Sequence, residues 1–544
     1  MMKKRAKSVG TFFAVLTIVF MVIMVSGCSK NTDTTDQAVS LEGRFTVDEN
    51  TPSWKLDPKE DTTLTWYVNA DWWNTDWGTD VVTKKIKEDL NLDVKFIVGD
   101  DTKLNTFFAG GDLPDIITIF DSSSRVAQSA DQWAYPLNDL ADKYDPYFYQ
   151  VAKSDTLGWF QLSDGKTYGY PDYSNSQEDY DEGYIGAATA FVIRKDIYEA
   201  LGEPRMNTQE EFISVLSEIK EKYPNLIPFG FNTMADSTGS LGATFQNFIG
   251  VPIENEDGSW YDRDMNPDYL SWVRTFNEAY NKGLISDDCF SDDSTANEDK
   301  MKTGKFATMM LAGTPHCSGA LQIWMNSNPS AAYMAIDGPQ STVGNAPTLS
   351  QAGLSGWAVN YITKNCSDPI KAMELFTYLL TDDAGILTTY GVQGETYSLD
   401  ENGKIQLLPD VKKMKESEND LFKEKYRLGE FCLFGHDRYL SYSSESIQST
   451  AQMVKWGEGK LKPQFLIENI NPDQGTAEAR SLSAIDTKWI TTLVSLIRAK
   501  DSSQFDQLLK GYQTFRETNN WDKILEVRNT KMDKNRHKLG LTDE

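Results

Sequence analysis

Histidine and cysteine are scarce in this sequence, with three His and five Cys among 544 residues. The histidines, His316, His436 and His537, lie too far apart along the chain to predict a metal site, and no Cys-x-x-Cys pair occurs. A Gly-x-Ser-x-Gly elbow, a His-Glu-x-x-His motif and a phosphate-binding loop are also missing. The sequence therefore gives no motif-based reason to predict an enzyme, and we expect no cofactor.

Basic residues are outnumbered as well, 53 Lys and Arg against 80 Asp and Glu, for a formal net charge of -27. Proteins that bind nucleic acids need basic patches that neutralise phosphates. Anionic lipid headgroups likewise attract clusters of Lys and Arg. We therefore expect no nucleic-acid partner and no membrane contact through charge.

Long apolar runs are confined to the N-terminus. A basic stretch, Lys3–Lys7, precedes an apolar run from Thr11 to Val25 that is too short for a typical spanning helix. The segment Val25-Ser26-Gly27-Cys28 that ends this run resembles the bacterial lipobox. This implies a lipoprotein signal peptide at 1–27 and lipid on Cys28; the alternative is an ordinary signal with a chance cysteine. Residues 28–61 are polar and predict the anchor and a flexible tether.

The other cysteines stand apart from this signal. An exported chain permits disulfides, but a domain of this size does not need them for stability. We favour free, buried thiols, although pairing cannot be deduced from spacing. These cysteines are Cys289, Cys317, Cys366 and Cys432.

Strand-like and helix-like segments alternate along most of the chain, which predicts α/β units with mostly parallel, buried sheets. The first series comprises strand 63–68, helix 81–90, strand 92–98, helix 103–110 and strand 115–120. A second series begins after Gly186, with strands 190–193, 227–231 and 305–311 and helices 195–201, 207–222 and 268–282. Later helices are expected at 369–380 and 486–499.

Five segments in this order carry a family resemblance: 64–69, 109–121, 191–202, 303–313 and 357–380. The chain resembles bacterial extracellular solute-binding lipoproteins of carbohydrate ABC transporters, the maltose-binding-protein-like group, and especially its long Gram-positive oligosaccharide-binding members. The resemblance implies a two-lobed, periplasmic-binding-protein-like α/β fold with hinge crossings and a ligand cleft between the lobes. We expect lobe 1 at 62–186 and 356–400, and lobe 2 at 187–355 and 401–544 with a helical tail.

The loop after the first strand is rich in tryptophan. Sugar rings stack their apolar faces on aromatic rings, while fixed amides and carboxylates bind their hydroxyls. Asn69, Trp72, Trp73 and Trp77 are therefore candidates. We expect at least one of these tryptophans in the core and at least one, with Trp73 favoured, in the cleft.

Further ligand candidates follow later strand ends or the expected lobe crossing. They are Asp121, Asp236, His316, Trp324, Trp357 and Tyr397. Asp121 stands where the maltose-binding pattern has a hydroxyl-binding Asp, and capping of the next helix is its alternative role. Trp357 is favoured for stacking on a sugar. The tryptophan that maltose-binding protein has just after the proline is missing here, so Trp324 is either its substitute or a core residue.

Two acidic stretches, 172–182 and 287–298, are candidate calcium-binding segments. Neither has the spaced pattern of a calcium loop, and a solvated acidic face is the favoured interpretation. A structural calcium, which some long members of the family carry, stays open.

These features together predict a monomeric receptor rather than an enzyme. It would hold an oligosaccharide by lobe closure and pass it to ABC permease subunits, while Cys28 anchors it at the outer face of a Gram-positive cell membrane. A surface glycoside hydrolase, which needs two carboxylates across a cleft, and a carbohydrate-binding adhesin are the alternatives. A peptide ligand also stays open.

Overall fold

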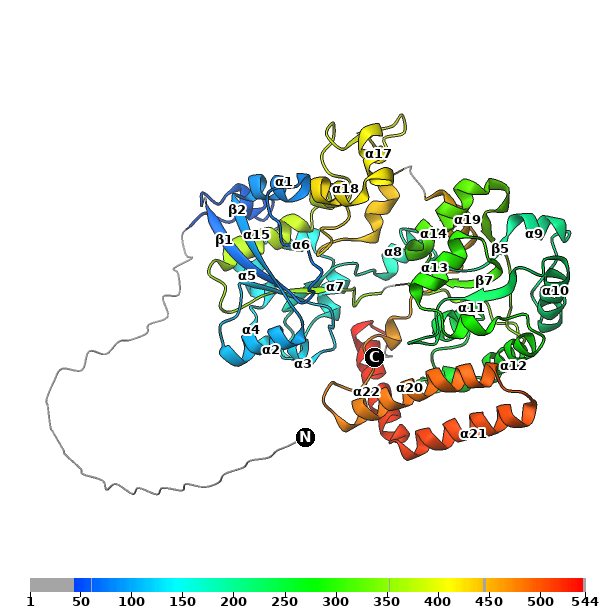
Figure 1. The fold of residues 1–544 in the computed structure, drawn as a ribbon. Helices are drawn as coiled ribbons and strands as arrows, with labels where there is room; N and C mark the ends of the chain where they lie inside the picture. Colours follow the sequence, from blue (N-terminus) through cyan, green and yellow to red (C-terminus); the bar gives the residue numbers. More distant parts are fainter. Residues whose placement is uncertain (1–43, 60, 352, 444–446, 542–544) are drawn as a thin grey trace, which may run out of the picture. The chain divides into compact units, whose positions relative to one another are not determined.

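A computed structural model describes residues 44–59, 61–351, 353–443 and 447–541 (Figure 1). The expected signal peptide 1–27 and Cys28 lie outside the described residues. Residues 43–544 form one compact unit. No helix in the described part of the chain combines the length and the apolar character that crossing a bilayer requires.

The first sheet has five strands in the order β2-β1-β3-β9-β4. They are β1 Thr62–Val68, β2 Leu92–Val98, β3 Ile116–Ile119, β4 Gly169–Pro171 and β9 Val359–Ile362. Strands β1, β2 and β3 are parallel, as the sequence predicts, but β9 runs antiparallel to both β3 and β4. The parallel arrangement predicted for the first three strands is therefore confirmed, and the reversed strand β9, which returns from the second sheet, makes the sheet mixed.

Side chains of the first sheet alternate between two cores. Leu64, Trp66 and Val68 point to one face, and Tyr67 with Ile117 points to the other. The helices that pack on these faces and share these cores form the first lobe. They are α1 Val81–Leu90, α2 Asp101–Gly110, α3 Arg125–Gln128, α4 Ala130–Trp133, α5 Leu137–Tyr144, α6 Phe148–Val151, α7 Ser154–Trp159, α15 Pro369–Leu379, α16 Asp382–Tyr390, α17 Pro409–Ser417 and α18 Asn419–Tyr426.

The second sheet is also mixed, in the order β6-β7-β5-β8. Its strands are β5 Thr189–Arg194, β6 Ile227–Phe231, β7 Phe306–Ala312 and β8 Tyr333–Ala335. One large core joins it to the helices of the second lobe. They are α9 Lys195–Ala200, α10 Gln209–Lys222, α11 Ala243–Phe248, α12 Pro267–Asn281, α13 Ser294–Lys302, α14 Thr314–Ser327, α19 Gln448–Trp456, α20 Ala477–Ile497, α21 Ser502–Thr518 and α22 Trp521–Lys538.

Local signals explain why several of these helices begin where they do. The Asp80 side chain accepts a hydrogen bond from the Thr83 amide at 2.8 Å and caps α1. At α10, Thr208 and Glu211 form the capping box that the sequence predicts. The chain leaves the first sheet after β4 through α8 Gln177–Asp181, returns to it at β9, and leaves the first core again after residue 434.

The N-terminal segment corrects the prediction of a tether reaching residue 61. Residues 44–59 pack on the first lobe, and Ser53 is fully buried. The guanidinium of Arg44 pairs with Asp57 and, at 2.8 Å, with Asp368 at the start of α15. The part of the expected tether that the structure describes is therefore folded.

A second correction concerns residues 401–434, which the sequence assigned to the second lobe. The hairpin β10 Tyr397–Leu399 and β11 Ile405–Leu407 leads into α17 and α18. Side chains of this segment, including Val411, Phe422 and Phe431, belong to the core of the first sheet. The segment is thus part of the first lobe, and only the chain after it returns to the second core.

Candidate functional site

Three aromatic side chains gather where strands of the first sheet end. Trp72 follows β1, Phe120 follows β3, and Trp357 precedes β9. The rings of Trp72 and Trp357 are stacked at 6.0 Å between centroids, and Phe120 meets Trp357 edge-on at 4.7 Å. We call these three residues the aromatic platform.

The platform is unusual for its exposure. All 14 tryptophans lie in the described part of the chain, and Trp72 (62% exposed) and Trp357 (44% exposed) are the two that are exposed rather than buried or partly buried. Aromatic side chains carry a large apolar area whose exposure to water is unfavourable. Two such rings stacked beside each other at strand ends therefore indicate a surface that another apolar face covers.

Two polar residues, Asn69 and Asp71, precede Trp72 in the same loop. Asn69 accepts from the Tyr67 hydroxyl at 2.8 Å and donates to Asp101 at 2.7 Å, so its amide is held in place. Asp71 is exposed, and no described residue bonds to its carboxylate. Fixed amides beside a free carboxylate suit the hydroxyl groups of a ligand stacked on the rings.

Asp121 is bonded within its own turn and to the second lobe. Its carboxylate accepts from the amide and hydroxyl of Ser123, at 2.9 and 2.6 Å, and from the Gln474 amide at 2.9 Å. The neighbouring Ser122 hydroxyl accepts from Asn469 at 3.1 Å. Ser124, rather than Asp121, caps α3. Residues 469–474 therefore lie against the strand-end loop of the first lobe.

Trp73 and Trp77 both pack against the first core. Trp73 is 4% exposed within the first core, so the prediction that favoured it as a ligand residue is wrong. Trp77 is half-buried and donates to the Leu92 carbonyl at 3.1 Å. The sequence predicts that at least one tryptophan of this loop lies in the core. Trp73 is that residue, and Trp72 is the exposed one.

Arg427 explains how the loop is held, and the sequence did not reveal it. This buried guanidinium donates to the carbonyls of Asn74 and Asp76, both at 2.6 Å. It also lies over the rings of Trp73 and Phe431, each 5.3 Å from its centre. Burial lowers the pKa of Arg427 and nearby Asp80 opposes the shift. Arg427 therefore holds the loop from its buried side, while Trp72 lies on the exposed side.

Two of the three candidates in the second lobe are exposed and the third is packed. Asp236 is exposed in the loop after β6, and His316 is exposed in the first turn of α14. Trp324 packs over Gly304, before β7, and donates to the Ala331 carbonyl at 2.7 Å. Gly304 lies at the opposite end of β7 from Ala312, so Trp324 is a packing residue and does not replace a ligand contact.

Tyr397 is another candidate that the structure removes. It is 8% exposed and packs with Tyr390 and Ile405 in a small cluster of the β10–β11 hairpin. Its backbone lies in strand β10, which pairs with β11. The sequence misled here because a Tyr after a glycine-rich turn is equally typical of a hairpin.

Side-chain cations pair with some of the carboxylates in each acidic stretch. Lys300 bonds to Asp288 and Asp292, both at 2.5 Å. In the other stretch Lys153 pairs with Asp179, and His436 Nε2 lies 3.6 Å from it; burial opposes the effect of these neighbours, but together they lower the pKa of the Asp179 carboxyl. The residues that the structure describes hold no group of three or more potential metal-ligating side chains. The four cysteines discussed above are free, as predicted.

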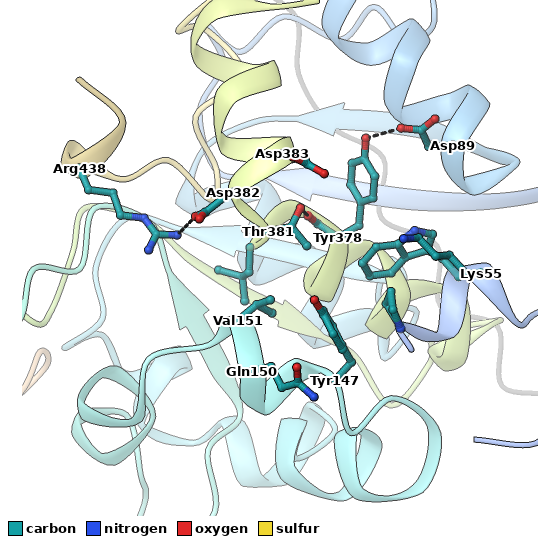
Figure 2. Close-up of a pocket in the computed structure, with 13 residues that line it drawn as sticks. Lys55, Asp89, Tyr147, Gln150, Val151, Tyr378, Thr381, Asp382, Asp383 and Arg438 are labelled. Carbon is teal, nitrogen blue, oxygen red and sulfur yellow. Dashed lines mark hydrogen bonds and ion pairs between the residues drawn. The ribbon is translucent and has the colours of Figure 1, made fainter. Parts of the chain in front are cut away.

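A separate hollow of about 790 Å³ lies elsewhere on the first lobe (Figure 2). We call it the first-lobe pocket. None of the residues predicted for ligand binding lines it. Its walls are Pro52, Trp54, Lys55, Asp89, Tyr147, Gln150, Val151, Tyr378, Leu380, Thr381, Asp382, Asp383 and Arg438.

Most polar groups of the first-lobe pocket already have partners. Figure 2 shows Tyr378 directed at Asp89, at 2.7 Å, and Arg438 directed at Asp382, at 2.5 Å. The Trp54 ring meets Tyr378 edge-on, with centroids 5.4 Å apart. The pocket is roomy, but its rings and charges are largely engaged with one another.

Comparison with known proteins agrees with this architecture. Residues 71–386, more than half of the chain, match the family model of bacterial extracellular solute-binding proteins. The lipoprotein LipO of Bacillus subtilis is 24% identical over 315 residues, 55% of this chain. The match spans 59% of LipO, less than two thirds of its length.

Two solved structures illustrate the shared fold. An HMO-binding, ABC-transporter-associated solute-binding protein of Bifidobacterium longum infantis has a TM-score of 0.65 at 14% identity, covering 88% of this chain and 99% of the other. The substrate-binding protein FusA of S. pneumoniae, solved with kestose, has a TM-score of 0.60 at 17% identity, covering 87% and 99%. At such identities the likeness establishes the fold alone.

Proposed function

This chain belongs to the family of bacterial extracellular solute-binding proteins, which bind a solute without transforming it, and we propose that its solute is an oligosaccharide destined for an ABC importer. Lipid on Cys28 would keep the receptor at the outer face of the cell membrane. LipO, a lipoprotein by its name, and the two oligosaccharide-related neighbours support this proposal by similarity.

The exposed aromatic platform is the observation that carries the proposal. A pyranose or furanose ring has an apolar C–H face that fits flat on an indole, and its hydroxyls need hydrogen-bonding groups at the rim. Trp72 and Trp357 offer the indoles, and Asn69 and Asp71 offer the rim. A peptide ligand would require main-chain partners or a specific side-chain pocket beside the rings, so the platform favours a sugar.

Contacts between the lobes suggest how binding is coupled to conformation. Gln474 and Asn469 reach the Asp121–Ser122 loop directly beside Phe120. A ligand on the platform that also touches these second-lobe groups binds the closed arrangement better than an open one, so it shifts the equilibrium toward closure. The closed form would then dock on the permease.

The test uses the chain from residue 29, which contains the compact unit 43–544. Calorimetry would measure its affinity for a panel of neutral saccharides: kestose, maltotriose, cellotriose and xylotriose. We expect at least one to bind at about one site per chain and to be recovered intact by chromatography. Binding of peptides but of no saccharide, or release of cleavage products, would refute the proposal.

A further inference from the structure

Trp357 belongs to a turn where segments that connect the two sheets meet. The first segment, after β4, contributes Ser174 and Asn175, which donate to the carbonyls of Leu354 at 2.7 Å and Gly353 at 2.9 Å. Glu468, far along the chain, accepts from the amides of Leu354 and Ser355. The turn 353–358 is thus held by groups from two other segments.

Asp172 holds the end of this turn that carries the platform ring. Its Oδ1 accepts from the backbone amides of Trp357, at 3.2 Å, and Ala358, at 2.6 Å. Its own amide donates to the Ala358 carbonyl at 2.9 Å. Gly356, at φ +64°, fits against the Asp172 carbonyl, where a Cβ would stand 2.1 Å from that oxygen.

We propose that Asp172 is a positioning residue of the ligand site: its carboxyl group fixes the backbone of Trp357 and thereby keeps the indole stacked on Trp72, ready for a sugar face. The indole is 44% exposed and touches only two aromatic neighbours, so its own packing restrains it weakly. The backbone clamp supplies the missing restraint. A ring that is already in place costs less entropy when ligand binds.

The surroundings of Asp172 make the clamp sensitive to pH. Its carboxyl is buried, and its Oδ2 atom has no hydrogen-bond partner. The titratable groups around it are Asp437, Cys432 and Tyr173, none of which is a cation at neutral pH. Burial chiefly, opposed by the two backbone amides and supported by Asp437, raises the pKa of Asp172 to about 8.

Burial therefore keeps the carboxyl neutral at pH 7, and Oδ1 of this neutral acid still accepts from both backbone amides. As pH rises through about 8 the carboxyl ionises; the two amides stabilise the buried charge only in part, so the carboxylate is drawn toward water and its hold on the Trp357 amide loosens. An Asp172→Asn side chain keeps the accepting oxygen and cannot titrate. An Asp172→Ala side chain removes the acceptor at every pH.

The first experiment needs no ligand. The chain from residue 29 is labelled with 5-fluorotryptophan, and the ¹⁹F resonance of Trp357 is assigned from its loss in Trp357→Phe. We expect this resonance to titrate near pH 8 in the wild type, to stay constant in Asp172→Asn, and to shift in Asp172→Ala at neutral pH. A Trp357 resonance identical in all three proteins over pH 6–9 would overturn the proposal.

The second experiment measures affinity for whichever panel saccharide binds, and this part rests on the proposed function. Asp172→Ala should weaken binding about tenfold at pH 7, while Asp172→Asn stays within about threefold and loses the fall above pH 8. Asp145→Asn, at a buried carboxyl that accepts from Ser53, is the matched control and should bind normally. Normal affinity in folded Asp172→Ala would refute the positioning role.

The two experiments distinguish failure of the proposed function from failure of the proposed role of Asp172. If no saccharide binds the wild type, the proposed function fails, and the ¹⁹F titration still decides whether Asp172 positions Trp357. Thermal unfolding of each variant shows whether it is folded. If Asp172→Ala does not fold, the comparison of the Trp357 ¹⁹F shift over pH 6–9 between the wild type and Asp172→Asn decides the question.

Discussion

The aromatic platform and the first-lobe pocket are both aromatic, and both belong to the first lobe, yet they differ in what their rings do. In the pocket, Trp54 presents its ring edge-on to Tyr147 and Tyr378, with interplanar angles of 88° and 81°. In the platform, Trp72 and Trp357 are the most exposed tryptophans of the chain. The difference is why we propose the ligand site at the exposed rings of the platform rather than in the larger hollow.

The largest expected effect is a loss of stability on replacing Arg427, which holds the loop that carries Trp72. Arg427→Ala removes the guanidinium that holds the carbonyls of Asn74 and Asp76, and leaves Asp80 buried without its nearby cation. We expect the free energy of unfolding in urea to fall by about 2–4 kcal/mol. Arg498→Ala, which removes a partly exposed pair with Asp287, should cost less than about 1 kcal/mol. Equal losses in the two variants would contradict this account.

Next come the platform rings themselves. Trp72→Ala and Trp357→Ala should each weaken saccharide binding by about 1–3 kcal/mol in calorimetry, because each removes one stacking face. Tyr149→Ala is the matched control, since Tyr149 is 42% exposed and remote in sequence from the platform. Unchanged affinity in both tryptophan variants would remove the platform as the site.

Stability should also depend on the protonation of Asp172. Its pKa of about 8 lies above the ordinary value of 3.8, so the folded state binds the proton more tightly than the unfolded state. This contribution is fully present below about pH 4 and is lost as pH rises toward 8. Between pH 6 and 8 the wild type should lose about 1–3 kcal/mol relative to Asp172→Asn in urea unfolding. A constant difference between the two proteins over this range would show that Asp172 does not titrate there.

The smallest effect is expected in the first-lobe pocket. Tyr147→Ala and Asp383→Asn change its wall without touching the platform. Saccharide affinity should change by less than about twofold in each, which lies within the scatter for residues outside an interface. A loss comparable to that of Trp357→Ala would move the site from the platform to the pocket.

The regular elements were predictable from sequence because their signals are local. Segment 81–90 is apolar at helical spacing and forms α1, and 227–231 forms β6. The cap at Thr208 likewise depends only on nearby residues. Periodicity and capping are read from neighbours in the chain, so tertiary packing seldom overturns them.

The site was only partly predictable, because exposure depends on distant partners. Trp72 and Trp73 are adjacent in sequence, and Arg427, some 350 residues later, decides which of them is buried. Trp357 was expected to stack, but the contribution of Phe120 and the clamp by Asp172 needed the assembled sheet. The folding of residues 44–59 was missed for the same reason, since Arg44 and Asp57 look like tether residues until Asp368 meets them.

The most direct test of the central claim observes both regions in one titration. The chain from residue 29, labelled with 5-fluorotryptophan, is titrated with the panel saccharide that binds, and the ¹⁹F lines of Trp72, Trp357 and Trp54 are followed after assignment by single Trp→Phe variants. The account predicts that the Trp72 and Trp357 lines move with ligand while the Trp54 line, in the first-lobe pocket, stays in place. Movement of the Trp54 line, with Trp72 and Trp357 unchanged, would contradict it.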